Sequence, residues 1–290
     1  VEWAKAPVER YIEDGSTKKT EPFNQPVGED HEVLCGDMRK LEYENEFDAV
    51  LTDPPYYNNV IYSELSNFFY VWQRLLLKDE YEDFESDTTP RADSIVANPA
   101  EGKDETDFEE ELFQSFSKIH QALKQDGVLA FTYHHSDAES WGELLGALCE
   151  VGFEVTATYP VTADTNRATY KLNEGESVDF DIIIVARPAQ DRQPISWNSL
   201  RRNIYRTAQK TRKRLEENRE LSRGDIGVVE MGRCFHEYSK HHGKVERAGE
   251  TMTAKEVVDE IYGVIQHGSD IGEIDVFLDL LETPDASFDD

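Results

Sequence analysis

The sequence predicts an α/β fold in which a mostly parallel sheet is covered by helices and followed by a helical C-terminal extension. Short aliphatic runs alternate with amphipathic helical patterns across residues 31–186, as is typical of strand–helix–strand units. After Pro188 the strand pattern gives way to helical periodicity. We therefore expect a linker or frayed segment at 1–30, an α/β domain at 31–190 and a helical extension with an acidic tail at 191–290.

The first elements follow from local composition. Two strands are expected at His31–Asp37 and Phe47–Thr52, and an aromatic helix from about Ile61 to Leu77. The next segment, Lys78–Asp104, is acidic, contains proline and lacks periodicity, so it predicts a mobile loop. The sequence leaves open whether such a loop closes over a substrate or is only a solvated insertion.

A second helix is expected from Thr106, because Thr106 and Glu109 have the spacing of a capping box. We expect Gln125-Asp126-Gly127 to end this helix and Val128–Tyr133 to follow as a buried strand. The apolar residues that recur at helical spacing along the helix are Phe108, Leu112, Phe113, Phe116, Ile119 and Leu123.

The remaining elements are a helix, a hairpin and a helical C-terminal part. The helix opens at Ser140 and carries Trp141, Leu144, Leu145 and Leu148, and the strands Phe153–Val161 and Val178–Ala186 predict an antiparallel hairpin. Further on, Thr253 and Glu256 form a capping box, and Asp285–Asp290 is expected to be a solvated tail. Core positions of the C-terminal part with helical spacing are Ile226, Val228, Met231, Phe235 and Tyr238.

The charge balance is strongly acidic. Sixty Asp and Glu residues against thirty Lys and Arg give a net charge of −30 and an isoelectric point near 4.5. A halophilic cytoplasm suits this composition, because the Debye length of about 3 Å at 1 M salt screens the self-repulsion. The apolar content of 38%, arranged in periodic blocks, excludes an intrinsically disordered acidic chain.

The cysteines and the apolar runs indicate an intracellular, cytoplasmic protein. Cys35, Cys149 and Cys234 are far apart, with neither the paired spacing of a zinc site nor an even count, so we expect buried thiols and no metal. No run of about eighteen apolar residues predicts a membrane span, and the first residues lack the apolar core of a signal peptide.

The most informative stretch is the strand Phe47–Thr52, which runs directly into Asp53-Pro54-Pro55-Tyr56. The two prolines fix φ and offer no N–H, so the turn is stiff and its carbonyls are available as acceptors. The Asp53 carboxylate and the Pro54 carbonyl can accept hydrogen bonds from an exocyclic amine and favour its pyramidal, nucleophilic form. Tyr56 can stack on a base that has been flipped out of a duplex. This arrangement predicts methyl transfer to an amino group.

The tetrapeptide after such a strand resembles the active-site motif of S-adenosylmethionine-dependent amino-methyltransferases. The longer run from Asp53 to Arg74, DPPYYNNVIYSELSNFFYVWQR, resembles adenine-specific DNA methylases of archaea and bacteria that carry a zinc ribbon elsewhere. The resemblance is strongest from Val33 to Arg74 and looser through Ala186 and around Gly224–Val245. It implies a class I methyltransferase-like, Rossmann-like sheet, of which this sequence supplies strands three to seven. It also implies catalytic roles for Asp53, Pro54, Pro55 and Tyr56.

The glycine-rich cofactor loop of that superfamily is not found in this sequence. Gly142–Gly146 lies within a helical pattern, and Gly224–Gly227 follows no convincing strand. Two explanations remain open: the chain is the C-terminal part of a longer or split methyltransferase, in which an upstream segment or partner chain supplies the loop, or it is a remnant that no longer binds cofactor. We favour the first.

Two further groups are expected at the carboxyl edge of the sheet. Gly36 and Asp37 end the first strand, where a carboxylate can bind the adenine amino group or ribose of S-adenosylmethionine, although Gly-Asp also makes simple strand-end turns. Tyr133, His134 and His135 fall at the same edge. They are either contacts to the substrate strand or plain loop residues.

A basic run from Ser199 to Arg214 contains no acidic residue, in a chain where acids outnumber bases two to one. On a helix, its cations form one stripe opposite an apolar stripe, so the helix can dock on the domain and present cations to phosphates. The alternative is a solvated face paired with acidic neighbours. The predicted nucleic-acid contacts are Arg201, Arg202, Arg206, Lys210 and Lys213.

Together these features predict methyl transfer from S-adenosylmethionine to N6 of adenine in DNA. An RNA base amino-methyltransferase is the alternative within enzymes. A noncatalytic or split-enzyme subunit is the alternative outside them.

Overall fold

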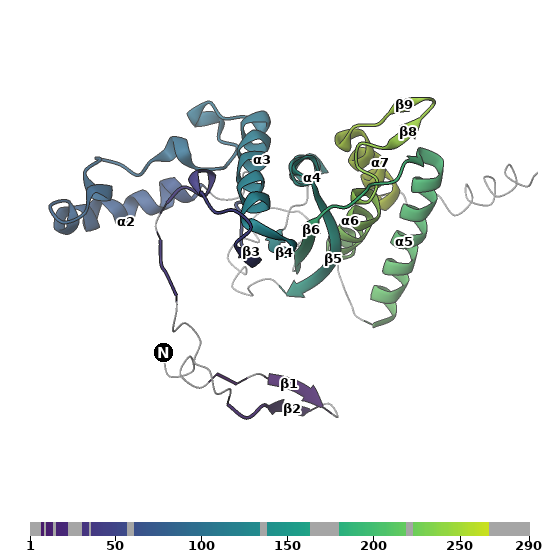
Figure 1. Ribbon diagram of the computed structural model, residues 1–290, viewed down its shortest axis with the longest axis horizontal. Coiled ribbons are helices and arrows are strands. Elements are labelled where there is room, and N and C mark those ends of the chain that lie inside the picture. Colours follow the sequence, from purple (N-terminus) through teal and green to yellow (C-terminus); the bar gives the residue numbers. More distant parts are fainter. Residues whose placement is uncertain are drawn as a thin grey trace, which may run out of the picture. The chain divides into compact units, whose positions relative to one another are not determined.

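The computed structural model describes residues 7–8, 10–13, 16–22, 31–34, 36–56, 61–133, 138–162, 180–218 and 223–266. It divides into two compact units, Val1–Asp37 and Met38–Asp290, and each is described by itself. The structure is shown in Figure 1.

The first unit contains an antiparallel hairpin of β1 (Arg10–Glu13) and β2 (Ser16–Lys19), which composition alone did not predict. The expected strand at His31–Asp37 is wrong: residues 31–34 and 36–37 belong to no strand, and Val33 and Leu34 are exposed. The sequence pattern was apolar enough for a strand, but an extended segment needs a hydrogen-bonded neighbour to become one. Cys35 lies outside the described residues.

The second unit is a mixed α/β structure built on a four-stranded sheet with the order β3-β4-β6-β5. β3 (Phe47–Thr52) and β4 (Leu123–Tyr133) are parallel, whereas β6 (Phe180–Pro188) is antiparallel to both β4 and β5 (Phe153–Thr162). The strand at Phe47–Thr52 and the antiparallel hairpin are therefore confirmed.

The start of β4 differs from the expectation. α3 (Glu105–Ala122) passes straight into β4 at Leu123, so Gln125-Asp126-Gly127 lies within the strand and does not end the helix. The capping box is formed by Asp104 and Asp107, two residues earlier than the expected Thr106 and Glu109. The predicted strand Val128–Tyr133 is confirmed as the second half of β4, and it is buried on alternate residues, that is, on one face.

Helices cover one face of this sheet. The Phe131 ring of β4 lies 5.6 Å from Phe116 of α3, and the Tyr133 ring lies 4.8 Å from Trp141 of α4 (Ala138–Val151). α6 (Arg223–Ser239) approaches the same face at Gly232, where an added Cβ would lie 3.1 Å from Ile182 Cδ1. Residues along this face, such as Leu129, are buried.

The C-terminal helices α5 (Trp197–Asn218), α6 and α7 (Ala254–Gln266) pack on one another, and α7 also packs on α4. A small sheet joins β7 (Ile195–Ser196), β8 (Val245–Arg247) and β9 (Glu250–Thr251). The expected capping box is confirmed, since the Thr253 amide donates to Glu256 at 2.7 Å and the Glu256 amide donates to Thr253 at 3.3 Å. Cys149 and Cys234 are buried, as predicted.

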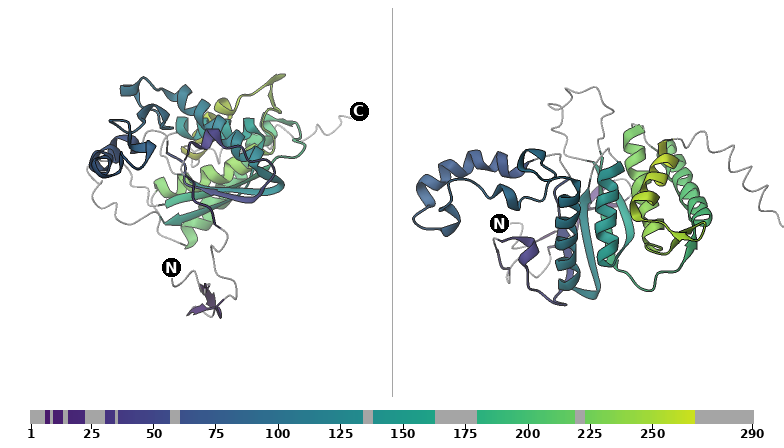
Figure 2. Two further views of the ribbon diagram at one scale, coloured as in Figure 1. Left: turned by 60° about the vertical axis from the view of Figure 1, so that its left-hand side comes forward. Right: turned by 90° about the horizontal axis from the view of Figure 1, so that it is seen from above.

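The aromatic helix is confirmed as α2 (Tyr62–Leu77), which extends beyond the sheet together with the segment after it (Figure 2). That segment contains three 3-10 turns: η2 (Glu82–Phe84), η3 (Arg91–Asp93) and η4 (Pro99–Glu101). It is not the freely mobile loop that its composition predicted, because Val96, Ala97 and Asn98 are buried.

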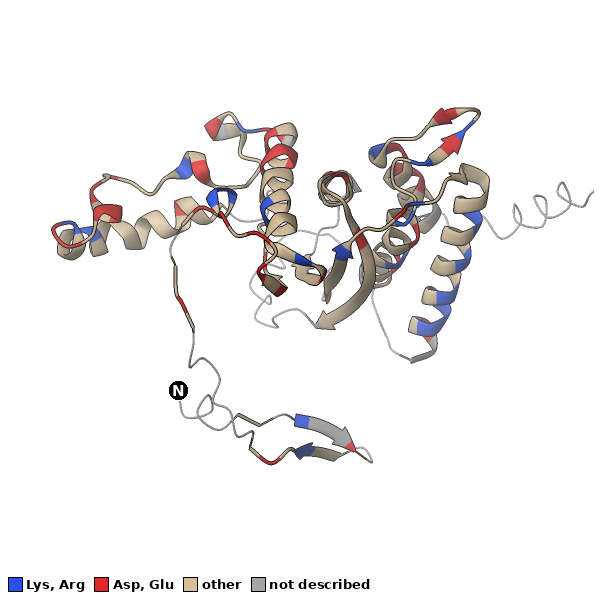
Figure 3. Ribbon diagram, in the orientation of Figure 1, with Lys and Arg blue, Asp and Glu red and all other residues tan. Residues whose placement is uncertain are grey.

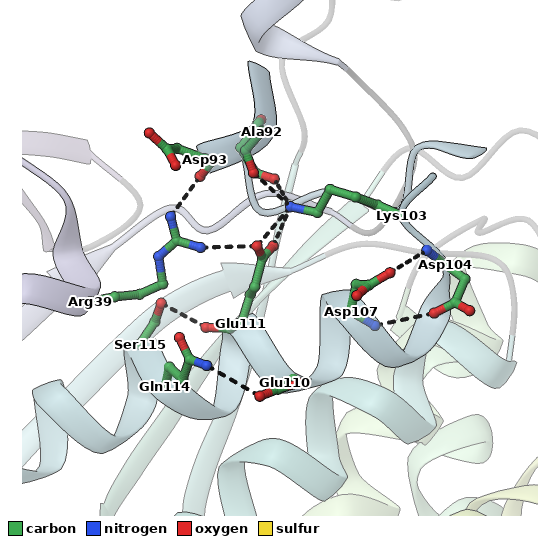
Figure 4. A network of polar contacts seen from close by, with 11 residues as sticks. Arg39, Ala92, Asp93, Lys103, Asp104, Asp107, Glu110, Glu111, Gln114 and Ser115 are labelled. Carbon is green, nitrogen blue, oxygen red and sulfur yellow. Dashed lines mark hydrogen bonds and ion pairs between the residues drawn. The ribbon is translucent and has the colours of Figure 1, made fainter. Parts of the chain in front are cut away.

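A polar network fastens this segment to α3 (Figure 4). Glu111 of α3 accepts from Lys103 at 2.6 Å and from Arg39 at 2.9 Å, and Arg39 belongs to η1 (Met38–Lys40). Lys103 also donates to the Ser94 carbonyl at 2.5 Å, and Arg39 to the Asp93 carbonyl at 2.9 Å. All three charged side chains are mostly buried, so the network is expected to persist at high salt.

Among the described helices, none has the length and apolar character that crossing a bilayer requires. The acidic tail at Asp285–Asp290 lies outside the described residues.

Candidate active site

The turn that follows β3 lies at the carboxyl edge of the sheet. β3 and β4 are parallel, with Thr52 opposite Phe131, so Asp53 and Thr132 come from neighbouring strand ends. Ligands of open α/β sheets bind at such an edge. Asp53 is exposed, and Pro54, Pro55 and Tyr56 are partly exposed.

Hydrogen bonds from two hydroxyls fix the Asp53 carboxylate. The Tyr56 hydroxyl donates to Asp53 Oδ1 at 2.7 Å, and the Thr132 hydroxyl, 2.9 Å from the Tyr56 oxygen, donates to the same Oδ1. In the part of the chain that the structure describes, both hydrogen bonds accepted by Asp53 fall on Oδ1. Its second oxygen therefore faces no protein donor there and can accept one from a ligand.

The Tyr56 ring is positioned by the aromatic core. Its centroid lies 5.5 Å from that of the Tyr133 ring in a T-shaped arrangement, so Tyr133 does not cover both faces of the Tyr56 ring. Burial raises the pKa of the Tyr56 hydroxyl, a hydrogen bond with Thr132 lowers it, and the Asp53 carboxylate raises it further. The hydroxyl therefore stays protonated at neutral pH and remains a donor to Asp53.

A second carboxylate, Asp181, faces the same corner. Thr132 lies opposite Ile183 in the antiparallel pair of β4 and β6, so Asp181, two residues earlier, is on the same sheet face as Thr132 and nearer the strand end. Its charge contributes to the raised pKa of Tyr56. We missed Thr132 and Asp181 in the sequence. The signal for both was a polar residue at the strand end beside the Asp53 turn.

The other predicted site residues have separate outcomes. Tyr133 is buried in the core, where its hydroxyl lies 3.1 Å from the Ser140 carbonyl, so it is not a substrate contact. His134 and His135 lie outside the described residues. Gly36 and Asp37 belong to the first unit, and their predicted role in cofactor binding stays a prediction.

The basic run forms helix α5, on which Arg206, Lys210 and Lys213 are exposed and Arg201 and Arg202 partly exposed (Figure 3). The opposite stripe is buried at Leu200, Ile204 and Ala208, as the helical spacing predicted. This face does not adjoin the Asp53 turn, because α5 packs on α6, which lies over β5 and β6, whereas β3 is at the other edge of the sheet.

Arg212, from the same run, has a structural role. Its guanidinium makes a two-point ion pair with Glu230 of α6, at 3.0 and 2.8 Å, and donates to the Ile265 carbonyl of α7 at 3.0 Å. Glu230 is fully buried, and burial raises the pKa of its carboxyl, although Arg212 opposes this. Arg212 therefore ties α5 to α6 and α7.

Comparisons with known proteins add little to this geometry. No protein-family model matches the sequence, and no curated protein matches it. One solved chain, from Thermus thermophilus and provisionally named a DNA modification methylase, aligns with 15% identity and a TM-score of 0.30 over 61% of this chain and 61% of that chain. This chain thus spans less than two thirds of that protein, and a similarity this weak supports no conclusion about function.

Proposed function

We propose that this chain is the catalytic part of an S-adenosylmethionine-dependent methyltransferase that modifies N6 of adenine in DNA. The observation that carries the proposal is the Asp53 carboxylate, held at a sheet edge by Thr132 and Tyr56 with one oxygen facing no described protein donor, in front of the stiff Pro54-Pro55 turn. The mixed sheet is compatible with the second half of a class I methyltransferase-like sheet.

The residues of the turn have separate tasks in this reaction. The second oxygen of Asp53 accepts one N–H of the exocyclic amine and the Pro54 carbonyl accepts the other, so the nitrogen lone pair is drawn out of conjugation. Pro55 keeps the turn rigid, and Tyr56 stacks on the extruded base. When bound, S-adenosylmethionine supplies an electrophilic methyl group. The amine nitrogen, polarised by Asp53 and Pro54, would accept this methyl group while the C–S electron pair stays on sulfur, and its excess proton would pass to water.

The cofactor site is completed only in part by this sequence. Gly36 and Asp37 are the residues we propose for it, since a glycine has no side chain to obstruct a ligand and Asp37 provides a carboxylate. The glycine-rich loop is not in the sequence. We propose that an upstream segment or a partner chain supplies it.

Nucleic acid is the proposed substrate because of the exposed cations of α5. Arg201, Arg202, Arg206, Lys210 and Lys213 would contact phosphates along the flank of the domain, in the halophilic cytoplasm that the acidic composition suggests. Their distance from the Asp53 corner suits a long duplex or a folded RNA. An RNA substrate therefore remains the alternative.

Incubation with labelled S-adenosylmethionine and either duplex DNA or RNA, followed by nucleoside analysis, tests the proposal. N6-methyladenine in DNA is expected with the unaltered chain and not with Asp53→Ala. The missing glycine loop favours a second candidate, a noncatalytic nucleic-acid-binding subunit. That candidate predicts no methylation in either polymer, and loss of binding in Arg206→Glu.

A further inference from the structure

Helix α2 exposes an apolar half to solvent. At about 100° per residue, its exposed large apolar side chains fall within one half of the circumference, and no residue of the helix is buried. Trp72 is 63% exposed and Leu76 80% exposed. The exposed side chains are Tyr62, Leu65, Phe68, Phe69, Val71, Trp72, Leu75 and Leu76.

The polar half of α2 contacts the rest of its own chain. Asn67 accepts from the Thr89 amide at 3.1 Å, Tyr70 donates to the Ser86 carbonyl at 2.7 Å, and Arg74 donates to the Glu85 carbonyl at 2.9 Å. In ordinary surface helices the apolar half faces the protein and the polar half faces water. Here the arrangement is reversed, so the apolar half is free to bind a group outside the described structure.

One face of the sheet is only partly buried in the part of the chain that the structure describes, and we refer to it as the uncovered face. The face opposite to α3, α4 and α6 is apolar, yet in the described strands none of its residues is buried, and Leu51 of β3 is 78% exposed. Pairing across the strands places one carboxylate, Asp181, and the following mostly apolar residues on it: Ala49, Leu51, Val128, Ala130, Thr132, Ile183, Val185, Ala157, Tyr159 and Val161. A sheet that is apolar on both faces needs cover on both.

The edge of β3 is a third exposed feature, because its backbone N–H and C=O groups on one side have no neighbouring strand in the described structure. In the described part of the chain β3 pairs with β4 alone and ends the sheet. Proteins normally protect such an edge with charge, proline or a bulge, because its unpaired N–H and C=O groups recruit other strands. The edge strand here, FDAVLT, has a single charged residue, Asp48, and its pairing with β4 is irregular only at its start, between Phe47 and Ala49, so the edge from Ala49 to Thr52 is regular.

We propose that α2, the edge of β3 and the uncovered sheet face form one docking surface for an α/β partner protein, which adds a strand to β3 and places apolar helices on α2 and the sheet. The four exposed aromatic residues of α2 alone present roughly 500 Å², at about 200 Å² for each ring. With the aliphatic side chains this surface reaches the roughly 800 Å² that each partner of a stable interface buries.

The negative charge of this chain favours a different protein over a second copy of the chain as the partner. Acidic residues follow the end of α2 and rim the surface, and the chain as a whole carries a net charge of −30, so two copies would set carboxylates against carboxylates. The partner is therefore expected to place Lys or Arg opposite this rim. The rim residues are Asp79, Glu80, Glu82, Asp83 and Glu85.

Photocrosslinking in cells tests the proposal. A benzophenone amino acid is placed at Leu51, at Leu75 or, as a control on another surface, at Gln209 of α5, and crosslinked peptides are sequenced. We expect Leu51 and Leu75 to react with the same partner polypeptide, the first within a strand and the second within an apolar helix. Gln209 is expected not to react with it. A product with a second copy, different partners at the two positions, or no product would overturn the proposal.

A matched pair of substitutions separates docking from folding. Leu75→Lys is expected to reduce the crosslink from Leu51 at least tenfold, whereas Ser66→Lys, at an exposed position about 180° away around the same helix, leaves it unchanged. Equal yields in the two variants would contradict the proposal. The docking surface is proposed independently of methyl transfer. A partner complex that methylates nothing would contradict the proposed function alone. Methylation by a chain that binds no partner would contradict the docking surface alone.

Discussion

Replacing Arg212 with Ala removes one half of a buried ion pair, and we predict a large and pH-dependent loss of stability. The Glu230 side chain is 1% exposed, whereas that of Arg212 is 31% exposed. Breaking such a pair from one side leaves an uncompensated buried charge and costs about 3–5 kcal/mol. The lost hydrogen bond to the Ile265 carbonyl adds about 1 kcal/mol.

The pH dependence follows from the direction of the Glu230 shift. Burial raises its pKa in the folded protein, so the stability that this carboxyl contributes is greatest at acid pH and declines as pH rises through the folded pKa. Without Arg212 the pKa rises further. The difference between wild type and Arg212→Ala should therefore be larger at pH 7.5 than at pH 5, because the raised pKa brings protonation of Glu230 closer at the lower pH.

Denaturant unfolding in multimolar KCl, followed by circular dichroism, measures both effects. Arg206→Ala, on the exposed face of the same helix, is the control and should change the free energy of unfolding by less than about 0.5 kcal/mol. Replacing both Arg212 and Glu230 with Met should recover most of the loss. A loss below about 1 kcal/mol for Arg212→Ala, or one that is equal at both pH values, would refute the reasoning.

Three further predictions concern the site, the basic face and a buried histidine. Thr132→Val removes a donor to Asp53 and should lower kcat of methyl transfer about tenfold, the equivalent of roughly 1.5 kcal/mol, with unchanged stability in the unfolding assay. Equal kcat would count against the role of Thr132. Arg206→Ala should weaken DNA binding and reduce the slope of log Kd against log salt concentration by about 1, as measured by fluorescence anisotropy. An unchanged slope would mean that Arg206 contacts no phosphate. Burial lowers the pKa of His242, so its contribution to stability is lost as pH falls below its ordinary value, and His242→Gln should flatten the stability profile between about pH 7 and 5. A parallel profile would contradict this.

Elements whose hydrophobic pattern matched their burial could be predicted from the sequence. α4, α5 and the β5–β6 hairpin fall where periodicity placed them, and α2 does so too although its apolar residues are exposed. The errors arose where tertiary partners decide the outcome. The described residues of the predicted first strand, 31–34 and 36–37, have a strand-like sequence but belong to no strand. The acidic segment after α2 is fastened by Glu111, whose contacts to Lys103 and Arg39 no local pattern could reveal.

The candidate site shows the same division. The Asp53 turn was visible because its stiffness and acceptors are encoded in consecutive residues. Thr132 and Asp181 reach it through strand pairing, which a single sequence does not specify. In the sequence, Arg212 cannot be distinguished from its neighbours in the basic run. Its structural role is apparent only from its ion pair with the buried Glu230 of α6.

Nucleoside analysis of DNA is the most direct test of the central role of Asp53. DNA from cells that produce the chain together with its own binding partners is digested, and N6-methyladenine is quantified for wild type, Asp53→Asn and the surface control Gln209→Ala. We predict N6-methyladenine with wild type and the control, and at least a hundredfold less with Asp53→Asn. An equal amount with Asp53→Asn, or none with wild type, would contradict the proposed chemistry.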